Sequence, residues 1–211
     1  MRVVGVFGGT FDPPHFGHLR TAVEIYQDLD LAEVRLIPCR QPPHRPEPSA
    51  SPAQRLAMLV AAVGDQPGLL IDERELLRPG PSYMVDTLAS LRAELGPTPL
   101  ALIVGWDAFA GLDSWHKWRE IFELAHLIIV KRPTADLTPG DELAMLLNSR
   151  RVDRSAQLES QPAGLILVHV ITQMDISASA IRALVARGKS ARYLTPDSVC
   201  GYIEQQRLYQ Q

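Results

Sequence analysis

The chain has 211 residues, of which 46% are hydrophobic and 21% are charged, and its formal net charge is −3. This balance is ordinary for a globular protein, and the small negative charge gives no general attraction to nucleic acid. The longest apolar runs, near residues 100–105 and 164–171, are too short to span a bilayer. Cys39 and Cys200 lie far apart in apolar surroundings, which indicates buried thiols rather than a disulfide or a metal site. No signal peptide is visible, so we expect a cytoplasmic protein without nucleic-acid or membrane partners, in an oligomeric state that stays open.

Short apolar runs alternate with amphipathic helical patterns along nearly the whole chain. The runs predict strands at 2–7, 34–38, 69–72, 99–104, 127–131 and 165–170. The patterns predict helices at 17–29, 52–64, 83–95, 115–124, 140–150, 178–187 and 196–207. Strands rich in Val, Ile and Leu with little alternation are buried on both faces, as in a parallel sheet covered by helices. We therefore expect an α/β fold with a single-domain, doubly wound (Rossmann-like), mostly parallel sheet over residues 1–211, helical at 172–211, with ligands bound beyond the carboxyl ends of the strands.

Residues 8–18 read GGTFDPPHFGH and connect the first predicted strand to the first predicted helix. A glycine turn before a helix N-terminus forms an anion site, because free backbone N–H groups and the helix dipole point at one spot. Gly8 and Gly9 let the backbone approach a bulky ligand, and His15 and His18 share a helix face from which both can reach a phosphate. The alternative is a βα loop with two solvated histidines. A zinc site is disfavoured, because the i, i+4 spacing of helical ligands and a Cys pair are both missing.

The same stretch has the form G-x-F-x-P-x-H-x-G-H, filled by Gly9, Phe11, Pro13, His15, Gly17 and His18. It resembles the signature of the nucleotidylyltransferase superfamily, whose enzymes move a nucleoside monophosphate from ATP or CTP onto a phosphate. The resemblance implies that this turn binds the nucleotide.

A second stretch, residues 174–182 (MDISASAIR), follows the last predicted strand and opens a helix. Ser177 is a suitable N-cap, which explains one hydroxyl. The second hydroxyl, of Ser179, and the guanidinium of Arg182 one turn further indicate a phosphate cradle that faces the first. The segment resembles the ISSTxIR motif of the same superfamily, which holds the ATP triphosphate, with Ala178 and Ser179 at its two middle positions.

The proline-rich segment 41–52 (QPPHRPEPSASP) has two compatible interpretations. It can be a surface loop that ends at an N-cap on Ser51, with Pro52 in the first helical turn. It can also be a mobile lid that brings His44 and Arg45 toward a phosphate, since binding residues are often held on loops.

The middle of the chain carries the residues that would select the acceptor. Residues 81–88 (PSYMVDTL) begin a predicted helix, residues 105–109 (GWDAF) follow a predicted strand, and residues 115–118 (WHKW) and 131–133 (KRP) lie beyond. With a length near 210 residues, this set resembles the bacterial nicotinate-nucleotide adenylyltransferases across essentially the whole sequence. The resemblance implies that the SY…DTL helix start binds the nicotinate carboxylate and that a tryptophan of the W-x-x-W pair stacks on the pyridine ring. Met84 stands where a threonine is common in the family.

Some of these residues also have structural interpretations. Trp118 is expected in the core, whereas Trp115 is favoured as the stacking residue. Trp106 can belong to the core or to the wall of a cleft. Asp107 can be a turn residue, or it can accept hydrogen bonds from ribose hydroxyls at the carboxyl end of a strand.

The resulting hypothesis is transfer of AMP from ATP to nicotinate mononucleotide, giving nicotinate adenine dinucleotide and pyrophosphate in NAD biosynthesis. The expected catalytic residues are His15, His18 and Arg182. The residues expected to bind ATP are Gly8, Gly9, Thr10, Phe11, His15, His18, Gly105, Asp107, Ile176, Ser177, Ser179 and Arg182. Those expected to bind nicotinate mononucleotide are Thr10, His44, Ser82, Tyr83, Met84, Val85, Thr87, Asp107 and Trp115. Mg²⁺ is expected to arrive with ATP, since no acidic cluster marks a protein-held metal site.

Other functions stay open at this point. They are an adenylyltransferase that prefers nicotinamide mononucleotide or another phosphate acceptor, and a non-catalytic nucleotide sensor of the same fold. A class I aminoacyl-tRNA synthetase fragment is disfavoured, because no KMSKS-like loop and no RNA-binding domain is visible.

Overall fold

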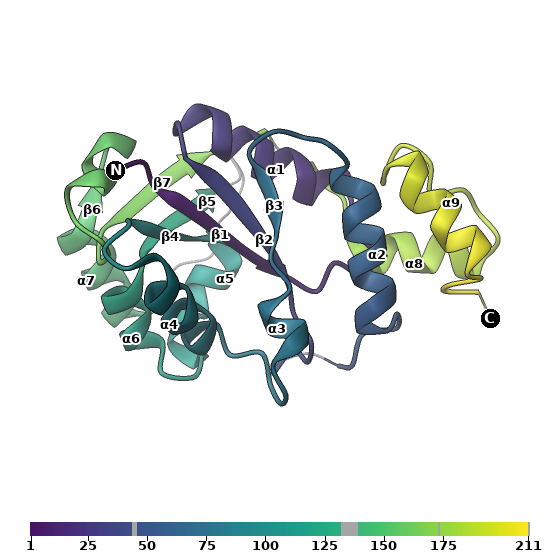
Figure 1. Cartoon of the computed structure of the whole chain (residues 1–211), viewed down its shortest axis with the longest axis horizontal. Coiled ribbons are helices and arrows are strands. Elements are labelled where there is room, and N and C mark those ends of the chain that lie inside the picture. Colours follow the sequence, from purple (N-terminus) through teal and green to yellow (C-terminus); the bar gives the residue numbers. More distant parts are fainter. Residues whose placement is uncertain (44–45, 132–138, 173, 211) are drawn as a thin grey trace.

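The structure, a computed structural model, describes residues 1–43, 46–131, 139–172 and 174–210. Seven strands form one sheet in the order β3-β2-β1-β4-β5-β7-β6, and every neighbouring pair is parallel (Figure 1). The strands are β1 (Val4–Gly9), β2 (Glu33–Pro38), β3 (Leu69–Ile71), β4 (Leu100–Gly105), β5 (His126–Lys131), β6 (Arg151–Val152) and β7 (Ile166–Val170). The predicted parallel α/β fold is therefore confirmed.

The strand order reverses next to β1. The chain starts in this central strand, runs outward through β2 and β3, and returns to pair β4 with the other side of β1, with Val4 opposite Leu100 and Val6 opposite Leu102. In open parallel sheets, the crevice at such a reversal, beyond the carboxyl ends of the strands, is where ligands bind. The fold thus places the segments that follow β1 and β4 on either side of one crevice.

Helices cover both faces of the sheet. The helices of the described residues are α1 (Phe16–Asp28), α2 (Pro52–Val63), α3 (Arg74–Leu77), α4 (Met84–Leu95), α5 (Trp106–Ala110), α6 (Trp118–Leu124), α7 (Asp141–Arg150), α8 (Ala178–Ala186) and α9 (Asp197–Gln205), with 3₁₀ turns at Leu112–Ser114 and Ser155–Ser160. No helix of the described ranges is both long and apolar enough to cross a membrane.

The two cores follow from the alternation of side chains along the strands. Leu102 and Leu127 face the cluster formed with α4, α5, α6 and α7, whereas Ile103 and Ile128 face the cluster formed with α1 and α2. All four side chains are buried. Strands that are apolar on both faces have continuous hydrophobic sequences, which is why the apolar runs alone identified them.

The C-terminal part packs beside the sheet domain rather than on the sheet. Helix α9 lies against α2 (Figure 1), where Val199 and Ile203 share a buried cluster with Met58. Leu208, beyond the end of α9, completes this cluster. The packing brings the last residues of the chain close to the segment that precedes α2.

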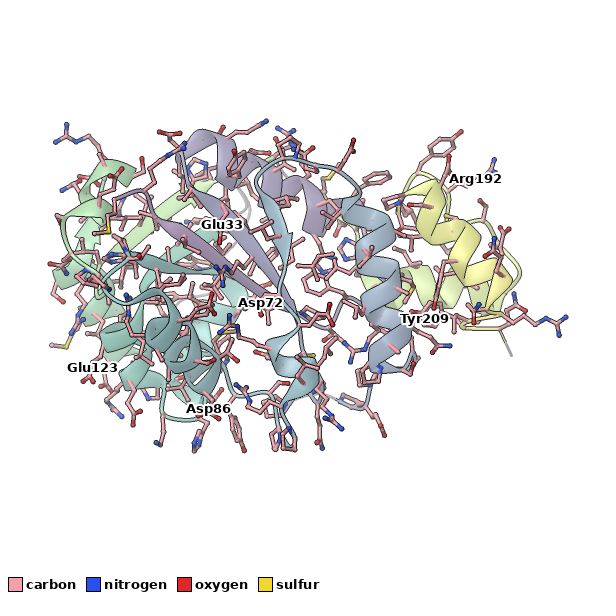
Figure 2. The ribbon with its side chains drawn as sticks, viewed as in Figure 1. Glu33, Asp72, Asp86, Glu123, Arg192 and Tyr209 are labelled. Carbon is pink, nitrogen blue, oxygen red and sulfur yellow. The ribbon has the colours of Figure 1, made fainter. Side chains whose placement is uncertain are left out.

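Charged side chains fix the C-terminal end of α4 relative to β2 and β3. Asp72, labelled in Figure 2 just after β3, accepts hydrogen bonds from Arg74, and Arg74 also donates to Glu94 on α4 at 2.6 Å. Arg35 on β2 donates to the same Glu94 at 2.9 Å and to Glu33 at 2.7 Å. This network holds α3 and the end of α4 to the β2–β3 edge of the sheet.

Most element boundaries agree with the sequence predictions to within two residues. The helix predicted at 115–124 was wrong in its first turn, because Trp115 is extended and Lys117 has the left-handed φ of +52°, so α6 begins at Trp118. The short helices α3 and α5 and the two-residue strand β6 were not predicted. Such short elements carry too few residues for a periodic signal.

Candidate active site

A cavity of about 860 Å³ opens at the carboxyl ends of the central strands. It brings together the loop after β1, the start of α4, the segment after β4 and the segment before α8. The predicted residues that line it are Gly8, Gly9, Thr10, Phe11, His15, His18, Ser82, Tyr83, Met84, Gly105, Asp107, Trp115, Ile176, Ser177, Ser179 and Arg182. His44 and Arg45, predicted to reach a phosphate, lie outside the described residues.

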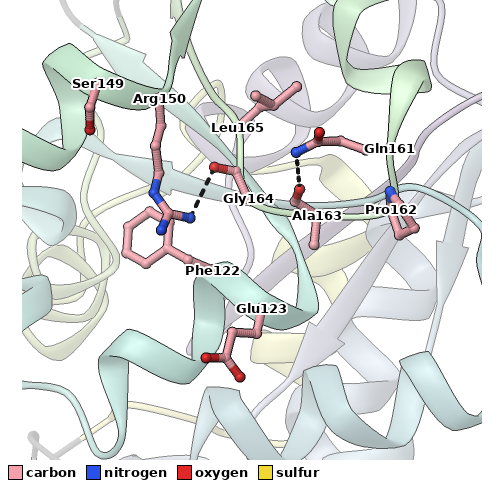
Figure 3. A pocket seen from close by; sticks show the side chains of 9 residues that line it. All are labelled: Phe122, Glu123, Ser149, Arg150, Gln161, Pro162, Ala163, Gly164 and Leu165. Carbon is pink, nitrogen blue, oxygen red and sulfur yellow. Dashed lines mark hydrogen bonds between the residues drawn. The ribbon is translucent and has the colours of Figure 1, made fainter.

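A second hollow lies at the opposite end of the strands, near the amino ends of β5 and β7 (Figure 3). It is lined by residues around Phe122, Arg150 and Gly164, and Arg150 donates a hydrogen bond to the Gly164 carbonyl. The guanidinium of Arg150 also lies 5.3 Å from the centre of the Phe122 ring. This hollow contains none of the motif residues, whereas His15, His18 and Arg182 line the first cavity.

The loop at residues 8–18, the signature loop, needs its glycines for close packing. A Cβ added to Gly8 would lie 2.6 Å from Cε of Met84, and a Cβ on Gly9 would lie 2.9 Å from the Phe11 ring. Phe11 is buried although its backbone has a φ of +50°. The loop is therefore packed closely against Met84 at the start of α4, and its non-helical part ends at His15, the N-cap of α1.

The two histidines of the loop are packed ring on ring. Their ring centroids are 3.7 Å apart with 27° between the planes, and the backbone N–H of His15 donates to Nδ1 of His18 at 3.3 Å. A Cβ on Gly17 would lie 2.9 Å from Nδ1 of His15, so a side chain at that position would displace the His15 ring. Because Nδ1 of His18 accepts, the proton of the neutral His18 ring is on Nε2.

The second motif contacts the signature loop directly. Ser177 caps α8 through a hydrogen bond from the backbone N–H of Ala180, and its Oγ lies 3.3 Å from Oγ of Ser179. Arg182, in the second turn of α8, donates from Nη1 to the carbonyl oxygen of Asp12 at 2.7 Å. The two predicted phosphate cradles thus face one cavity, although 170 residues separate Arg182 from Asp12.

The segment before α8 is also tied to α1. The backbone N–H and the hydroxyl of Thr172 both donate to Oε1 of Glu24, at 2.8 and 3.3 Å. Arg20 donates to the other oxygen of this carboxylate at 3.0 Å. Hydrogen bonds from these two residues hold the pKa of Glu24 below its usual value in spite of burial. The carboxylate is therefore an ionised anchor for the wall of the cavity.

The start of α4 borders the cavity, which is lined by Ser82, Tyr83 and Met84. Tyr83 is the N-cap and makes no side-chain capping bond, so its side chain does not occupy the N–H groups that the first helical turn leaves without an intrahelical partner. The hydroxyl of Ser82 accepts from the backbone N–H of Arg40 at 2.9 Å, which ties the helix start to the end of β2.

Two residues of the predicted acceptor set do not line the cavity. The Val85 and Thr87 side chains are buried in the core, at 3% and 0% exposure. The Thr87 hydroxyl donates to Oε1 of Glu75 at 2.6 Å and accepts from Nη2 of Arg78 at 3.0 Å. The α4 helix turns both side chains toward the core, and a role of Val85 and Thr87 in binding the mononucleotide stays a prediction.

Glu75 is a cavity residue that the sequence interpretation missed. It is only 2% exposed and lines the cavity wall, and burial raises the pKa of its carboxyl group. In the sequence it stands in RELLRPG, a charged stretch that gives no signal of a buried acid. Only the packing of α3 against α4 reveals it.

One of the three tryptophans lies in the hydrophobic core and two line the cavity. Trp118 is 6% exposed and belongs to the hydrophobic core, as predicted. Trp106 and Trp115 both line the cavity, and Nζ of Lys131 lies 4.9 Å from the Trp106 ring centre. The His116 ring packs on Tyr83 with centroids 4.3 Å apart. An aromatic wall therefore stands next to the start of α4.

Asp107 and Cys39 also line the cavity. Asp107 is exposed in the first turn of α5, directly after β4. Cys39 is half-buried rather than buried as predicted, with Sγ 3.8 Å from Oγ1 of Thr10. Among the described residues, no three His, Cys, Asp or Glu side chains gather as candidate metal ligands.

Comparisons with known proteins point to one family. A family model described as cytidylyltransferase-like matches residues 6–184. A probable nicotinate-nucleotide adenylyltransferase of Methylococcus capsulatus is 49% identical over 98% of this chain and 99% of the relative. One of Pseudomonas entomophila is 49% identical over 99% of this chain and 95% of the relative. The solved Plasmodium falciparum nicotinic acid mononucleotide adenylyltransferase complexed with NaAD has a TM-score of 0.74 at 15% identity, covering 99% of this chain and 98% of that one.

Proposed function

The chain belongs to the cytidylyltransferase-like family, and from this premise we propose that it transfers AMP from ATP to nicotinate mononucleotide in NAD biosynthesis. Relatives that match it over nearly their full length carry the name nicotinate-nucleotide adenylyltransferase. The observation that carries the proposal is the meeting of both motifs and the α4 start at one cavity, joined by the hydrogen bond from Arg182 to the Asp12 carbonyl. The products are nicotinate adenine dinucleotide and pyrophosphate.

The reaction needs no covalent intermediate. A phosphate oxygen of the mononucleotide attacks the α-phosphorus of ATP, the new P–O bond forms as the bond to the β-phosphate bridging oxygen breaks, and pyrophosphate leaves. Such phosphoryl chemistry requires mainly positioning and neutralisation of charge. The cavity supplies helix N-termini, two imidazoles and a guanidinium for that purpose.

The proposed role of His18 is to stabilise charge on the α-phosphate. Its Nδ1 accepts from the His15 backbone, so Nε2 carries the donor proton. His15 and Arg182 would hold the β- and γ-phosphates and the leaving pyrophosphate. Arg182 is about one-third exposed and lines the cavity, which suits a side chain that receives an anion.

The acceptor site is proposed at the aromatic end of the cavity. Amides of the α4 first turn would bind the nicotinate carboxylate, since a helix N-terminus favours an anion. Trp115 would stack on the pyridine ring, and Asp107 would accept hydrogen bonds from ribose hydroxyls. His44 remains the proposed contact of the acceptor phosphate.

Mg²⁺ is proposed to enter with ATP, bound by oxygens of the triphosphate and by water. This cation commonly binds substrate phosphates together with only one or two carboxylates. Its positive charge would neutralise the leaving pyrophosphate. Residues 1–211 are proposed to act as one nucleotidylyltransferase domain whose part at 172–211 carries the second motif, and a cytoplasmic location stays a prediction.

A labelling experiment tests the transfer. The chain is incubated with ATP labelled at the α-phosphate, Mg²⁺ and nicotinate mononucleotide, and the products are separated. The expected result is label in the dinucleotide and none in pyrophosphate, with no turnover when the mononucleotide is omitted. Release of labelled AMP at the same rate with and without the mononucleotide would contradict the proposal, because it would indicate hydrolysis.

A further inference from the structure

Asp12 of the signature loop is a buried junction between distant segments. It is 3% exposed, and its carboxylate accepts hydrogen bonds from the backbone N–H groups of Ser49 at 2.8 Å and Ala50 at 3.1 Å. A third donor is the hydroxyl of Tyr209, 2.7 Å from Oδ1. The carboxylate thereby joins the signature loop to the segment before α2 and to the C-terminal end of the chain.

Tyr209 reaches this junction from beyond the end of α9. Figure 2 shows it between α2 and the C-terminal helices, and its ring packs against the buried cluster of Met58, Ile203 and Leu208. Its φ of +60° is uncommon for a residue with a side chain. Such a backbone conformation persists where the surroundings determine it strongly, here through the packed ring and the hydrogen bond to Asp12.

The junction also contacts the guanidinium proposed to hold the triphosphate. Nη1 of Arg182 donates to the Asp12 carbonyl at 2.7 Å and lies 3.8 Å from Oδ2 of the same residue. A carboxylate without its other donors would draw the guanidinium into a bidentate pair. The three hydrogen bonds that Asp12 already accepts oppose this, so Arg182 stays on the carbonyl with its other N–H groups available to an anion.

The Tyr209 hydroxyl remains a hydrogen-bond donor to the Asp12 carboxylate. Burial, together with the hydrogen bond to Asp12, raises the pKa of Tyr209 well above its usual value. The hydroxyl is therefore protonated wherever the protein is folded. A phenylalanine would fill the same space without the donor.

We propose that Tyr209 is a positioning residue for adenylyl transfer, which acts through Asp12 to hold the signature loop and Arg182 in the geometry that receives the ATP triphosphate. The proposal rests on the proposed role of Arg182 toward ATP. It extends the site to a residue that lies 197 positions from Asp12 and outside both motifs.

The test compares Tyr209→Phe with the matched variant Tyr202→Phe. Tyr202 is partly buried beside the same cluster, and its hydroxyl makes no hydrogen bond to the described residues. Tyr209→Phe should weaken ATP binding, measured by calorimetry and as KM, by roughly tenfold, which corresponds to one lost hydrogen bond. The KM for nicotinate mononucleotide should change less than about twofold, and Tyr202→Phe should resemble the wild type.

A double-mutant cycle identifies the route of the effect. If Tyr209 acts through Arg182, Tyr209→Phe should have a much smaller effect on ATP affinity in an Arg182→Lys background. Unchanged ATP affinity in Tyr209→Phe, additive effects in the cycle, or an equal loss for both substrates with a lower melting temperature would each overturn the proposal. Because calorimetry measures ATP affinity without turnover, these outcomes are distinguishable from the failure of the proposed function, in which the wild-type chain forms no dinucleotide.

Discussion

The His18 ring lies on the His15 ring with centroids 3.7 Å apart, and the His15 backbone N–H donates to Nδ1 of His18. The Phe11 and His18 rings pack edge to face, with centroids 5.1 Å apart. His18 is therefore oriented by two neighbours of the same loop, His15 and Phe11, and the proton of its neutral ring is on Nε2. Preorganised donors of this kind are the ones that stabilise developing charge effectively.

His18→Ala should lower kcat by roughly 10²-fold or more, the scale of removing one preorganised donor. His18→Gln, which can place an amide N–H near the former Nε2, should retain more activity than the alanine variant. The check is steady-state turnover together with thermal unfolding, and His169→Ala, away from the cavity beside Asp28, serves as the control. Wild-type turnover in a well-folded His18→Ala protein would remove His18 from the mechanism.

The two tryptophans of the W-x-x-W pair should respond differently to substitution. Trp115→Ala should raise the KM for nicotinate mononucleotide by roughly tenfold or more, because stacking on a flat ring contributes about 1–3 kcal/mol. Trp118→Ala should instead lower the free energy of unfolding by about 3–5 kcal/mol, since Trp118 is in the core. If Trp106→Ala affects the mononucleotide KM more than Trp115→Ala does, then Trp106 is the stacking residue.

Thr87 should influence the acceptor without touching it. Thr87→Val keeps the shape but leaves the buried carboxyl of Glu75 without its 2.6 Å donor, which costs about 1–3 kcal/mol of stability. Because the Thr87–Glu75 contact supports the start of α4, the KM for nicotinate mononucleotide should rise while the KM for ATP stays near wild type. Thr87→Ser, which keeps the hydroxyl, should have the stability and the KM for nicotinate mononucleotide of the wild type. A shift confined to ATP would show that this contact does not support the acceptor site.

His126 should make stability depend on pH. The ring is fully buried, its Nδ1 accepts from the Leu165 N–H at 3.0 Å, and its Nε2 lies 2.9 Å from the Gln161 carbonyl oxygen. Burial lowers the pKa of His126 from the usual 6.5, so below about pH 6.5 the unfolded chain binds a proton that the folded chain resists. The contribution of His126 is complete above that pH and is lost as the pH falls.

Urea unfolding at about pH 7.5 and pH 5.5 measures this effect. The wild type should lose stability at the lower pH, and His126→Gln, which cannot take up the proton, should lose less. The carboxylates titrate mostly below this window and are common to both proteins. An equal loss in both proteins would assign the pH dependence to other groups.

Much of the fold was predictable because it depends on local pattern. The long strands are continuous apolar runs because both faces are buried, whereas the main helices show the 3.6-residue period of amphipathic helices, so the two patterns differ clearly. The signature loop and residues 174–182 were recognisable because glycines, histidines and N-caps at fixed offsets have a local chemical reason. Their convergence on one cavity followed from the rule that ligands bind at the carboxyl ends of parallel strands.

The parts that escaped prediction depend on contacts between distant segments. The buried acid Glu75 lies in a charged stretch that reads as surface, and only its packing against Thr87 makes it part of the cavity. The hydrogen bond between Tyr209 and Asp12 spans nearly the whole chain. The Thr87 side chain is buried because that face of α4 packs on the core. The weakly amphipathic sequence of α4 did not indicate which face this is.

The most direct test of the central claim is the ratio of kcat/KM for nicotinate mononucleotide to that for nicotinamide mononucleotide, measured as dinucleotide formation at fixed ATP and Mg²⁺. The amides at the α4 start need an acceptor, and the neutral amide of nicotinamide turns an NH₂ group toward part of them, leaving buried N–H groups unpaired at about 1–3 kcal/mol each. The enzyme should therefore prefer the acid by roughly 10²-fold or more in kcat/KM. Comparable efficiency with the two acceptors, or no dinucleotide from nicotinate mononucleotide, would contradict it.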